Sequence, residues 1–411
     1  MPTSEIIAVG SELLTPLRLD TNSLYITRRL NDIGILVQRK WVVGDEPASL
    51  EEALRIAMMR VSTVLITGGL GPTEDDITRK VAAHVLDRQL IYNEEIAQKL
   101  RERFARVGRA LAENNLRQAL VPMGAIILPN SVGTAPGLWL EEGKKKIVLL
   151  PGPPREMKRM LDEHVIPRLA SATRGEPILR RVIKLAGIPE STADERIAPI
   201  YLGYPKIQTT ILAAPGQIEV HLTAVKSIHP QAEYDLDRLQ DQIEEALGDK
   251  VFSTEDKTLE EVVGIFLGMR QGTLAVAESC TGGLIAKRLT DVPGSSQYFN
   301  GGVVTYSDQS KIDLLGVDPE QLRQHGAVSA VVAEQMADGV RRRFGSTFGL
   351  SATGIAGPSG GSEEKPVGLV FLGWSDSAHC HSERIQFNGD RELVRQFAAQ
   401  NALNMARRNL V

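Results

Sequence analysis

The chain has 411 residues, of which 42% are hydrophobic and 24% charged, so it is long enough for two to three folded domains, and wholesale disorder is excluded. Lys and Arg together number 47 and Asp and Glu 51, and the net charge of −4 argues against a dedicated nucleic-acid binder. Two cysteines are too few for a disulfide framework or a cysteine zinc site, and no apolar run approaches the ~18 residues of a membrane span, so we expect a cytoplasmic protein without a membrane role.

The first ~165 residues alternate short apolar runs with helical patterns, which predicts an α/β domain with a mostly parallel sheet. Asp20 or Thr21 is expected to cap the first helix, and Ser49 the second. The predicted strands cover residues 5–10, 35–43, 63–67, 125–128 and 146–150. The predicted helices cover residues 22–31, 49–60 and 94–107. A further helix is expected to begin near residue 75, and another follows the chain break at 151–154 and extends to about 169.

The next ~80 residues have a different pattern, which predicts a small α+β module. Its strands are expected over 182–185, 207–211 and 218–225, with a long charged helix over 230–247. Residues 187–191 are expected to form a turn, and the polar stretch 248–257 is expected to be an exit linker.

From residue 258 the alternation of helices and strands returns, which predicts a second α/β domain. Its strands are expected over 273–277, 303–306, 347–352, 367–374 and 382–387. Its helices are expected over 258–270, 281–289, 330–344 and 391–409. The sequence thus predicts an α/β protein of two three-layer α/β/α domains joined by a small α+β module, with domains at 1–170, 171–250 and 251–411.

The first strand of this last domain leads into residue types that are suited to catalysis. Ser279 lies at the carboxyl end of the strand, where α/β sheets bind ligands. Thr281, Gly282 and Gly283 follow it, and the N-terminus of the next helix offers N–H groups to an oxyanion or a phosphate. The structural alternative is an N-cap followed by a tight turn. Cys280 is an alternative nucleophile, although burial is the more common fate of a free cysteine.

Later strand ends supply candidate partners for this serine. Tyr306 ends one strand and Lys311 follows about one helical turn later, and a Tyr or a buried Lys can take the proton of a hydroxyl nucleophile. The alternative for Lys311 is a solvated helix position. Thr353 and Gly354 open a Gly/Pro loop whose N–H groups suit a phosphate or a carboxamide, unless the loop is a plain connection. Arg391 suits a phosphate, unless it is only a surface residue at a helix N-terminus.

Four strand ends rich in glycine and hydroxyl groups in one domain indicate an enzyme rather than a set of chance turns. The residue types predict a hydroxyl nucleophile that acts on a small phosphorylated molecule. They leave open which bond is cut.

The N-terminal domain carries a second set of candidate residues. A glycine loop lies between its third strand and a helix, which suits a phosphate, although the loop lacks the lysine of a P-loop. Asp75 and Asp76 follow the loop, and their carboxylates suit a divalent metal such as Mg²⁺ or Mn²⁺. The alternative is that both acids cap a helix and complement its dipole. The loop supplies Thr67, Gly68, Gly69 and Gly71 as candidates for the phosphate contact.

Several motifs of the last domain occur together in one known family. These are AESCTGG (277–283), PGSS (293–296), VTYS (304–307), Lys311, TGIAGP (353–358) and KPVG (365–368). Over residues 258–411 the chain resembles the C-terminal domain of the CinA family, competence/damage-inducible protein A, and that domain resembles nicotinamide-nucleotide amidases. Such enzymes hydrolyse nicotinamide mononucleotide to nicotinate mononucleotide and ammonia, with no metal. The resemblance implies that Ser279 is the nucleophile and Lys311 its base, assisted by Tyr306. It also implies that Thr353 and Arg391 bind the substrate or support the oxyanion.

The N-terminal motifs carry a resemblance of their own. They are GSELL (10–14), DTNS (20–23), TGGLGPT (67–73), Asn130, GTAPG (133–137) and PGPPREM (151–157). Over residues 4–170 they resemble the molybdopterin-binding domain, and most closely the CinA N-terminal domain. Some relatives hydrolyse ADP-ribose to AMP and ribose 5-phosphate with a divalent metal. The resemblance implies such a site, with Asp75 and Asp76 as the metal ligands. It would be lined by Glu12, Asp20, Asn22, Thr67, Gly68, Gly69 and Gly71.

The middle module resembles the KH-type domain of the same family, but it lacks the Gly-x-x-Gly loop that clamps nucleic acid in KH domains. We therefore expect it to be a spacer or a dimerisation element of a homodimer. The leading hypothesis is a pyridine-nucleotide salvage hydrolase that acts on nicotinamide mononucleotide and ADP-ribose and binds neither nucleic acid nor membranes. The alternatives are a non-catalytic molybdopterin or nucleotide binder and a scaffold in competence or DNA damage.

Overall fold

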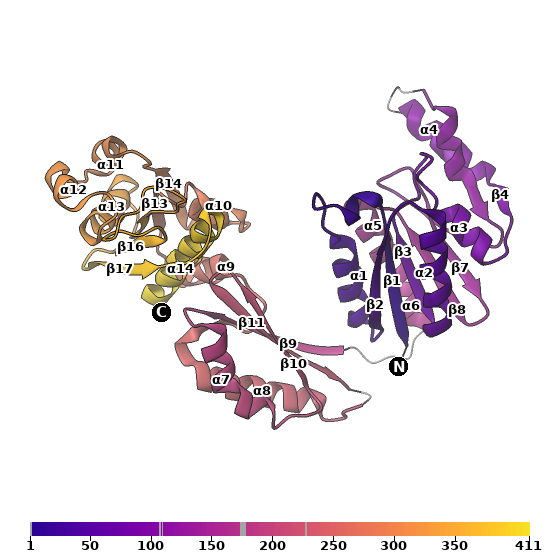
Figure 1. The fold of residues 1–411 in the computed structure, drawn as a ribbon, viewed down its shortest axis with the longest axis horizontal. Helices are drawn as coiled ribbons and strands as arrows, with labels where there is room; N and C mark the ends of the chain where they lie inside the picture. The colour runs from indigo at the N-terminus through magenta and orange to yellow at the C-terminus, as the bar shows by residue number, and fades with distance from the viewer. Residues whose placement is uncertain (1, 107, 109, 173–177, 227) are drawn as a thin grey trace. The chain divides into compact units, whose positions relative to one another are not determined.

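The computed structural model describes residues 2–106, 108, 110–172, 178–226 and 228–411. The chain divides into two compact units, Met1–Leu179 with Val225–Pro230, and Arg180–Ala224 with Gln231–Val411. The first unit is built around one α/β domain (Figure 1). The second contains the small middle module and the C-terminal α/β domain.

The N-terminal domain has a six-stranded sheet in the order β2-β1-β3-β8-β7-β6. The first four strands of this order are parallel, and β7 and β6 are antiparallel additions at one edge. The mostly parallel sheet is therefore confirmed, whereas strand β7 was not predicted. The strands are β1 (Thr3–Val9), β2 (Leu36–Val43), β3 (Thr63–Thr67), β6 (Ile126–Leu128), β7 (Gly137–Glu142) and β8 (Lys145–Leu150), with a separate pair β4 (Leu90–Tyr92) and β5 (Leu120–Pro122).

Helices cover both faces of this sheet, because alternate residues of each strand point to opposite sides. In β1, Ile6 packs with Ile26 of α1, and Ile7 packs with Leu50 of α2 in a separate cluster. The three-layer arrangement predicted for this domain is confirmed. The helices are α1 (Thr21–Asp32), α2 (Pro47–Arg60), α3 (Thr78–Val85), α4 (Glu94–Arg106), α5 (Pro154–Met160) and α6 (Ile166–Ala172), with short turns η1 (Ser11–Leu14), η2 (Glu113–Ala119) and η3 (Leu161–Val165).

The middle module is a four-stranded sheet in the order β10-β11-β9-β12 with two helices. Two expectations were wrong. Glu190 begins a twelve-residue helix rather than completing a turn. The stretch expected to be a linker contains β12, which pairs with β9 because its apolar residues complete the sheet edge. The elements are β9 (Ile178–Ala186), α7 (Glu190–Tyr201), β10 (Gln208–Ala214), β11 (Gln217–Val225), α8 (Ala232–Leu247), η4 (Gly248–Lys250) and β12 (Val251–Ser253).

The C-terminal domain has a five-stranded sheet in the order β14-β13-β15-β16-β17, with helices on both faces. In β13, Val276 packs with α9, α10 and α14, while Ala275 packs with α13. This confirms the second three-layer domain. Its strands are β13 (Leu274–Glu278), β14 (Phe299–Val304), β15 (Phe348–Gly354), β16 (Leu369–Ser375) and β17 (Cys380–Gln386). Its helices are α9 (Leu259–Met269), α10 (Leu284–Asp291), α11 (Asp308–Leu315), α12 (Pro319–His325), α13 (Ala330–Arg343) and α14 (Arg391–Leu410), with the short turn η5 (Ser295–Gln297).

Three of the helix starts that differ from the predicted ones have a clear local cause. α2 begins at Pro47, not at Ser49, because proline fits the first helical position, where no N–H bond is needed. α3 begins at Thr78 rather than near Asp75, because the preceding acids form a loop. α10 begins at Leu284 rather than at 281, because Gly283 adopts a left-handed conformation that ends the loop before it. Asp20 caps α1 as expected, through a bond from the Ser23 N–H.

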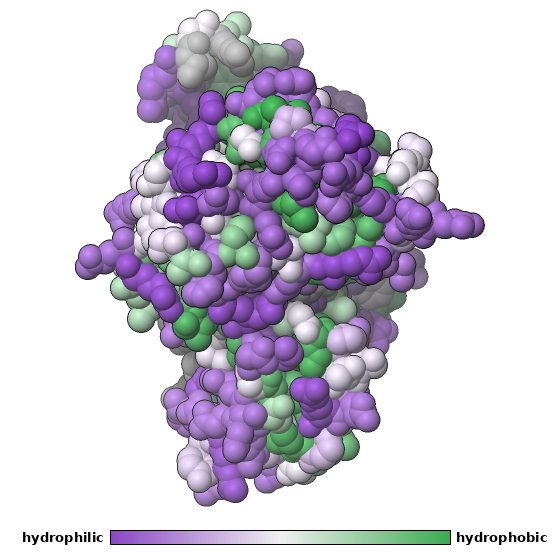
Figure 2. All heavy atoms as spheres, turned by 90° about the vertical axis from the view of Figure 1, so that its left-hand side faces the viewer, coloured by the Kyte–Doolittle hydropathy of each residue, from purple (hydrophilic) through white to green (hydrophobic). Residues whose placement is uncertain are grey.

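Hydrophilic residues cover most of the face drawn in Figure 2, with small apolar groups between them. In the part of the chain that the structure describes, no helix is both long and apolar enough to cross a membrane.

Candidate active site

Six of the nine residues predicted for the C-terminal site line one pocket of about 200 Å³. Ser279 directly follows β13, and its N–H donates to the carbonyl of Ala352 on the neighbouring strand β15. Because β14, β13 and β15 are parallel, their carboxyl ends lie at the same edge of the sheet. The residues that line the pocket are Ser279, Cys280, Tyr306, Asp308, Lys311, Ala327, Val328, Thr353, Gly354, Ala356 and Arg391.

A buried lysine contacts the serine hydroxyl. The Lys311 side chain is 1% exposed, and its Nζ lies 3.4 Å from the Ser279 Oγ and 2.9 Å from the Thr305 carbonyl oxygen, to which it donates. Burial lowers the pKa of Lys311 from its ordinary value, although the nearby Asp308 carboxylate opposes this shift. A larger fraction of neutral amine is therefore present near pH 7 than for a solvated lysine, which is what a general base requires. The solvated alternative for Lys311 is excluded.

Cys280 lies beside the serine but is unsuited to act as the nucleophile. Its side chain is buried, and burial raises the pKa of its thiol to about 12. Because the thiolate is the reactive form, this thiol is almost wholly unreactive at neutral pH. The geometry thus favours the hydroxyl of Ser279 over the neighbouring sulfur.

The Glu278 side chain occupies the N-terminus of α10, which was expected to be free for a ligand. Its buried carboxylate accepts hydrogen bonds from the backbone N–H groups of Gly283, Ile285 and Ala286, at 2.9, 3.2 and 2.8 Å. The N-terminus of α10 is therefore satisfied by the protein's own anion. The expectation that these N–H groups bind an oxyanion or a phosphate was wrong, because they already donate to the Glu278 carboxylate.

The predicted residues Thr281, Gly282 and Gly283 lie in the connection after Ser279 and not among the residues that line the pocket. The N–H of Gly282 donates to the Ser279 carbonyl at 3.2 Å, which tightens this turn. The Thr281 carbonyl accepts a bond from Arg395 at 2.9 Å. These three residues shape the loop that presents the serine.

Arg391 and Tyr306 form the exposed rim of the pocket. The Arg391 guanidinium donates to the Tyr306 hydroxyl and to the Gly357 carbonyl, both at 2.9 Å. Tyr306 is 64% exposed, and its hydroxyl accepts a hydrogen bond from this arginine rather than contacting the serine or the lysine. Thr353 is buried, and its hydroxyl donates to the Ala327 carbonyl at 2.8 Å. Asp308, at the start of α11, is a pocket residue that sequence reasoning missed, although the S-D-x-x-K spacing before Lys311 would have placed it one helical turn away.

Part of the predicted N-terminal site also comes together. The Asn22 amide nitrogen donates to the Thr67 hydroxyl at 3.0 Å and to the Gly152 carbonyl at 2.8 Å, so the start of α1 meets the ends of β3 and β8. The buried Asn22 amide oxygen has no hydrogen-bond partner among the described residues. A Cβ at Gly68 would clash with the Val9 carbonyl, so only glycine allows this close approach. Asp20 is used as the cap of α1, whereas the Glu12 side chain is exposed.

The acidic pair of this domain stabilises its own loop. The Asp76 carboxylate accepts bonds from the N–H groups of Gly71 and Thr73 at 2.6 and 2.7 Å, and Asp75 is exposed. Thr78 packs against the same loop, where its hydroxyl donates to the carbonyl of Gly68 and its N–H to that of Gly69. Within the described ranges, no group of three or more His, Cys, Asp or Glu side chains is placed to hold a metal ion. These residues do not fit the expected divalent metal, and we assign no metal-dependent step to this domain.

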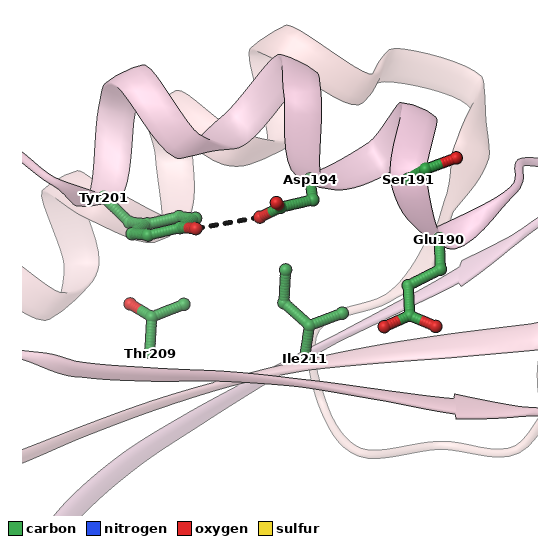
Figure 3. A pocket seen from close by; sticks show the side chains of 6 residues that line it. All are labelled: Glu190, Ser191, Asp194, Tyr201, Thr209 and Ile211. Atoms are coloured by element: carbon green, nitrogen blue, oxygen red, sulfur yellow. Dashed lines mark hydrogen bonds between the residues drawn. The ribbon is translucent and has the colours of Figure 1, made fainter.

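A larger pocket, of about 650 Å³, lies in the middle module between α7 and β10 (Figure 3). Asp194 accepts a hydrogen bond from the Tyr201 hydroxyl at 2.8 Å, and Glu190 lies at the other end of the pocket. Ser191, Thr209 and Ile211 complete its lining. Its charged residues are both acidic, so this pocket repels rather than attracts the phosphates of a nucleic acid.

Comparisons with known families give the same domain order along the chain. Residues 5–171 match the probable molybdopterin binding domain, residues 180–253 match the damage-inducible protein CinA KH domain, and residues 256–410 match the CinA C-terminal domain. Among solved structures, the competence/damage inducible protein CihA from Agrobacterium tumefaciens is 40% identical, with a TM-score of 0.35, over 36% of this chain and 90% of that chain.

Several relatives match the chain over almost its whole length. A CinA-like protein from Acidobacterium capsulatum is 50% identical and covers 99% of this chain and 100% of the relative. A second one, from Solibacter usitatus, is 49% identical and covers 99% and 98% of the two chains. A putative competence-damage inducible protein from Acetivibrio thermocellus is 42% identical over 98% of each. With this identity over all three domains, the chain belongs to the CinA family.

Proposed function

We propose that the C-terminal domain hydrolyses the carboxamide of nicotinamide mononucleotide to nicotinate mononucleotide and ammonia. The observation that carries this proposal is the buried Lys311 amine, 3.4 Å from the Ser279 hydroxyl at the carboxyl end of β13. A serine beside a desolvated lysine is an arrangement for nucleophilic attack on an amide carbonyl.

The reaction has two halves. Neutral Lys311 takes the proton from Ser279 as the Oγ attacks the carboxamide carbon, and the lysine ammonium then gives this proton to the departing nitrogen, so that ammonia leaves. The nicotinoyl group remains bound to Ser279 as an ester. Water then attacks this ester, Lys311 accepts a proton from the water, and the proton returns to the Ser279 oxygen as nicotinate mononucleotide is released.

Purified protein incubated with nicotinamide mononucleotide, without added metal, is expected to release ammonia and nicotinate mononucleotide in equal amounts. The mechanism uses only side chains of this chain, so a chelator is expected to leave the rate unchanged. Enzymatic ammonia detection and chromatography of the nucleotide measure the two products. Absence of both products at saturating substrate would overturn the proposal and favour a scaffold role.

Arg391 is the residue of the pocket rim best suited to the substrate phosphate. Arg391→Gln is expected to raise KM for nicotinamide mononucleotide about 10- to 100-fold, because a charge-assisted hydrogen bond is lost. For nicotinamide riboside, which lacks the phosphate, the same substitution is expected to change KM little. Steady-state kinetics with both substrates test this. Arg323→Gln, which removes an exposed arginine paired with Glu320, is the control for loss of one positive charge. Equal effects on both substrates would contradict a phosphate contact.

For the N-terminal domain, we propose binding of a nucleotide or a pterin at the ends of β3 and β8. The unpartnered amide oxygen of Asn22 supports this, because a buried acceptor without a donor costs stability unless a ligand supplies one. Fluorescence-detected or calorimetric titration with ADP-ribose tests the proposal, with Asn22→Leu expected to abolish binding.

A further inference from the structure

A second polar cavity of about 200 Å³ lies within the second unit, where the middle module meets the C-terminal domain. The end of β9 and the turn η4 line it from the middle module, and β17 and α14 line it from the C-terminal domain. Arg391 starts α14 and Arg407 lies sixteen residues later, so the two arginines are about 24 Å apart along the helix. The cavity is therefore separate from the pocket at Ser279.

Arg407 brings a buried positive charge into this cavity. Its side chain is 6% exposed, and its Nε and Nη2 donate to the Asn404 amide oxygen at 3.0 Å and to the Asp249 backbone carbonyl at 2.7 Å. Both acceptors are neutral. Among the described residues, the Asp249 carboxylate attracts Arg407 but forms its ion pair with Lys250. A buried guanidinium that donates only to neutral oxygens is costly, because these oxygens only partly replace its hydration.

The other charges of the cavity cancel one another. Lys250 pairs with Asp249 at 2.9 Å, and Arg408 pairs with Glu383 at 2.7 Å. Both pairs lie at the partly exposed rim, and with Arg407 the five groups sum to +1. No hydrogen bond of the described residues uses the Arg407 Nη1, so this nitrogen is available to a ligand.

We propose that this cavity binds one small oxyanion of the phosphate class, held by Arg407 between the middle module and the C-terminal domain. The Arg407 Nη1 and the second N–H of Nη2 lie at the same end of the guanidinium and can donate to two oxygens of such an anion. A single guanidinium with two of its three nitrogens already bonded serves one small anion, so inorganic phosphate is the matching probe. The bound anion would bridge the middle module and the C-terminal domain through Arg407.

Isothermal titration of the full chain with inorganic phosphate, at constant ionic strength in chloride, tests this site. Wild-type protein and Arg391→Gln are both expected to bind phosphate, the latter because its substitution affects only the pocket at Ser279. Arg407→Gln in the Arg391→Gln background is expected to lose at least about tenfold in affinity. Glycerol 2-phosphate, a bulkier ester, is expected to bind more weakly than inorganic phosphate, and tighter binding of the ester would identify a phosphorylated metabolite as the ligand.

Two controls separate this site from other effects. Arg323→Gln removes one exposed positive charge and is expected to bind phosphate like wild type. Should Arg407→Gln fail to fold, Lys250→Glu places a further carboxylate at the exposed rim and is expected to weaken phosphate binding. The proposal is overturned if the Arg391→Gln protein binds no phosphate at millimolar concentration, or if neither Arg407→Gln nor Lys250→Glu lowers the affinity.

Discussion

Ser279→Ala is expected to reduce kcat for ammonia release from nicotinamide mononucleotide by on the order of 10⁴-fold or more. The Ser279 oxygen forms the bond to the carboxamide carbon in the proposed reaction, and neither Lys311 nor water at the same place substitutes for it. KM is expected to change little, because the hydroxyl contributes little to binding of the ground state. A coupled assay for ammonia, with substrate varied around KM, measures both parameters.

The matched control is Cys280→Ala, which alters the adjacent residue. The high pKa of the Cys280 thiol keeps it protonated, so this variant is expected to retain activity within about tenfold of wild type. Thermal unfolding of both variants checks that each remains folded. An active Ser279→Ala enzyme together with an inactive Cys280→Ala enzyme would reverse the assignment and make the sulfur the nucleophile.

The residues of the C-terminal pocket could be predicted from the sequence because several of them lie at the ends of parallel strands. The buried run before Ser279 and the run before Thr353 form β13 and β15, which pair directly in register. Parallel neighbours place their carboxyl ends at one edge, so chemistry predicted at separate strand ends converges. The burial of Lys311 could not be predicted from the sequence pattern, because it depends on how α11 packs.

What the sequence could not give is which polar groups are already used by the protein. Glu278 looks like the last residue of an apolar strand, and nothing local indicates that its carboxylate turns back to cap α10. Asp76 looks like a metal ligand, yet its two oxygens hold the loop at Gly71 and Thr73. Both outcomes depend on tertiary geometry, since a carboxylate binds whichever donors lie nearest in space.

The prediction of secondary structure was wrong where packing, rather than the local sequence pattern, determines whether a strand or a helix forms. β12 has only three residues, and β7 is buried over its first four residues, so neither shows the alternating pattern of a half-buried strand. α7 contains Pro199 and several residues of low helix propensity, and its packing against α8 maintains the helix.

Lys311→Met is expected to reduce kcat by about 10³-fold, because the side chain keeps its length but loses the amine that accepts the proton. Unfolding stability is expected to remain near that of wild type, since methionine fits an apolar buried position and only the bonds to the Ser279 hydroxyl and the Thr305 carbonyl are lost. Lys311→Arg is the sharper variant. A guanidinium stays charged in proteins, so this variant is expected to be inactive at every pH at which the protein is folded.

The pH profile of the wild-type enzyme tests the same role without removing the side chain. Lys311 acts as a base only when neutral, and burial lowers its pKa, so kcat/KM is expected to rise with pH and to level off below the ordinary pKa of lysine, 10.5. The Asp308 carboxylate raises the pKa of Lys311, in opposition to burial. Asp308→Asn is therefore expected to move the rising limb to lower pH, whereas Arg323→Gln should leave it in place. A limb that stays fixed in Asp308→Asn, or that moves to higher pH, would mean that another group carries the proton.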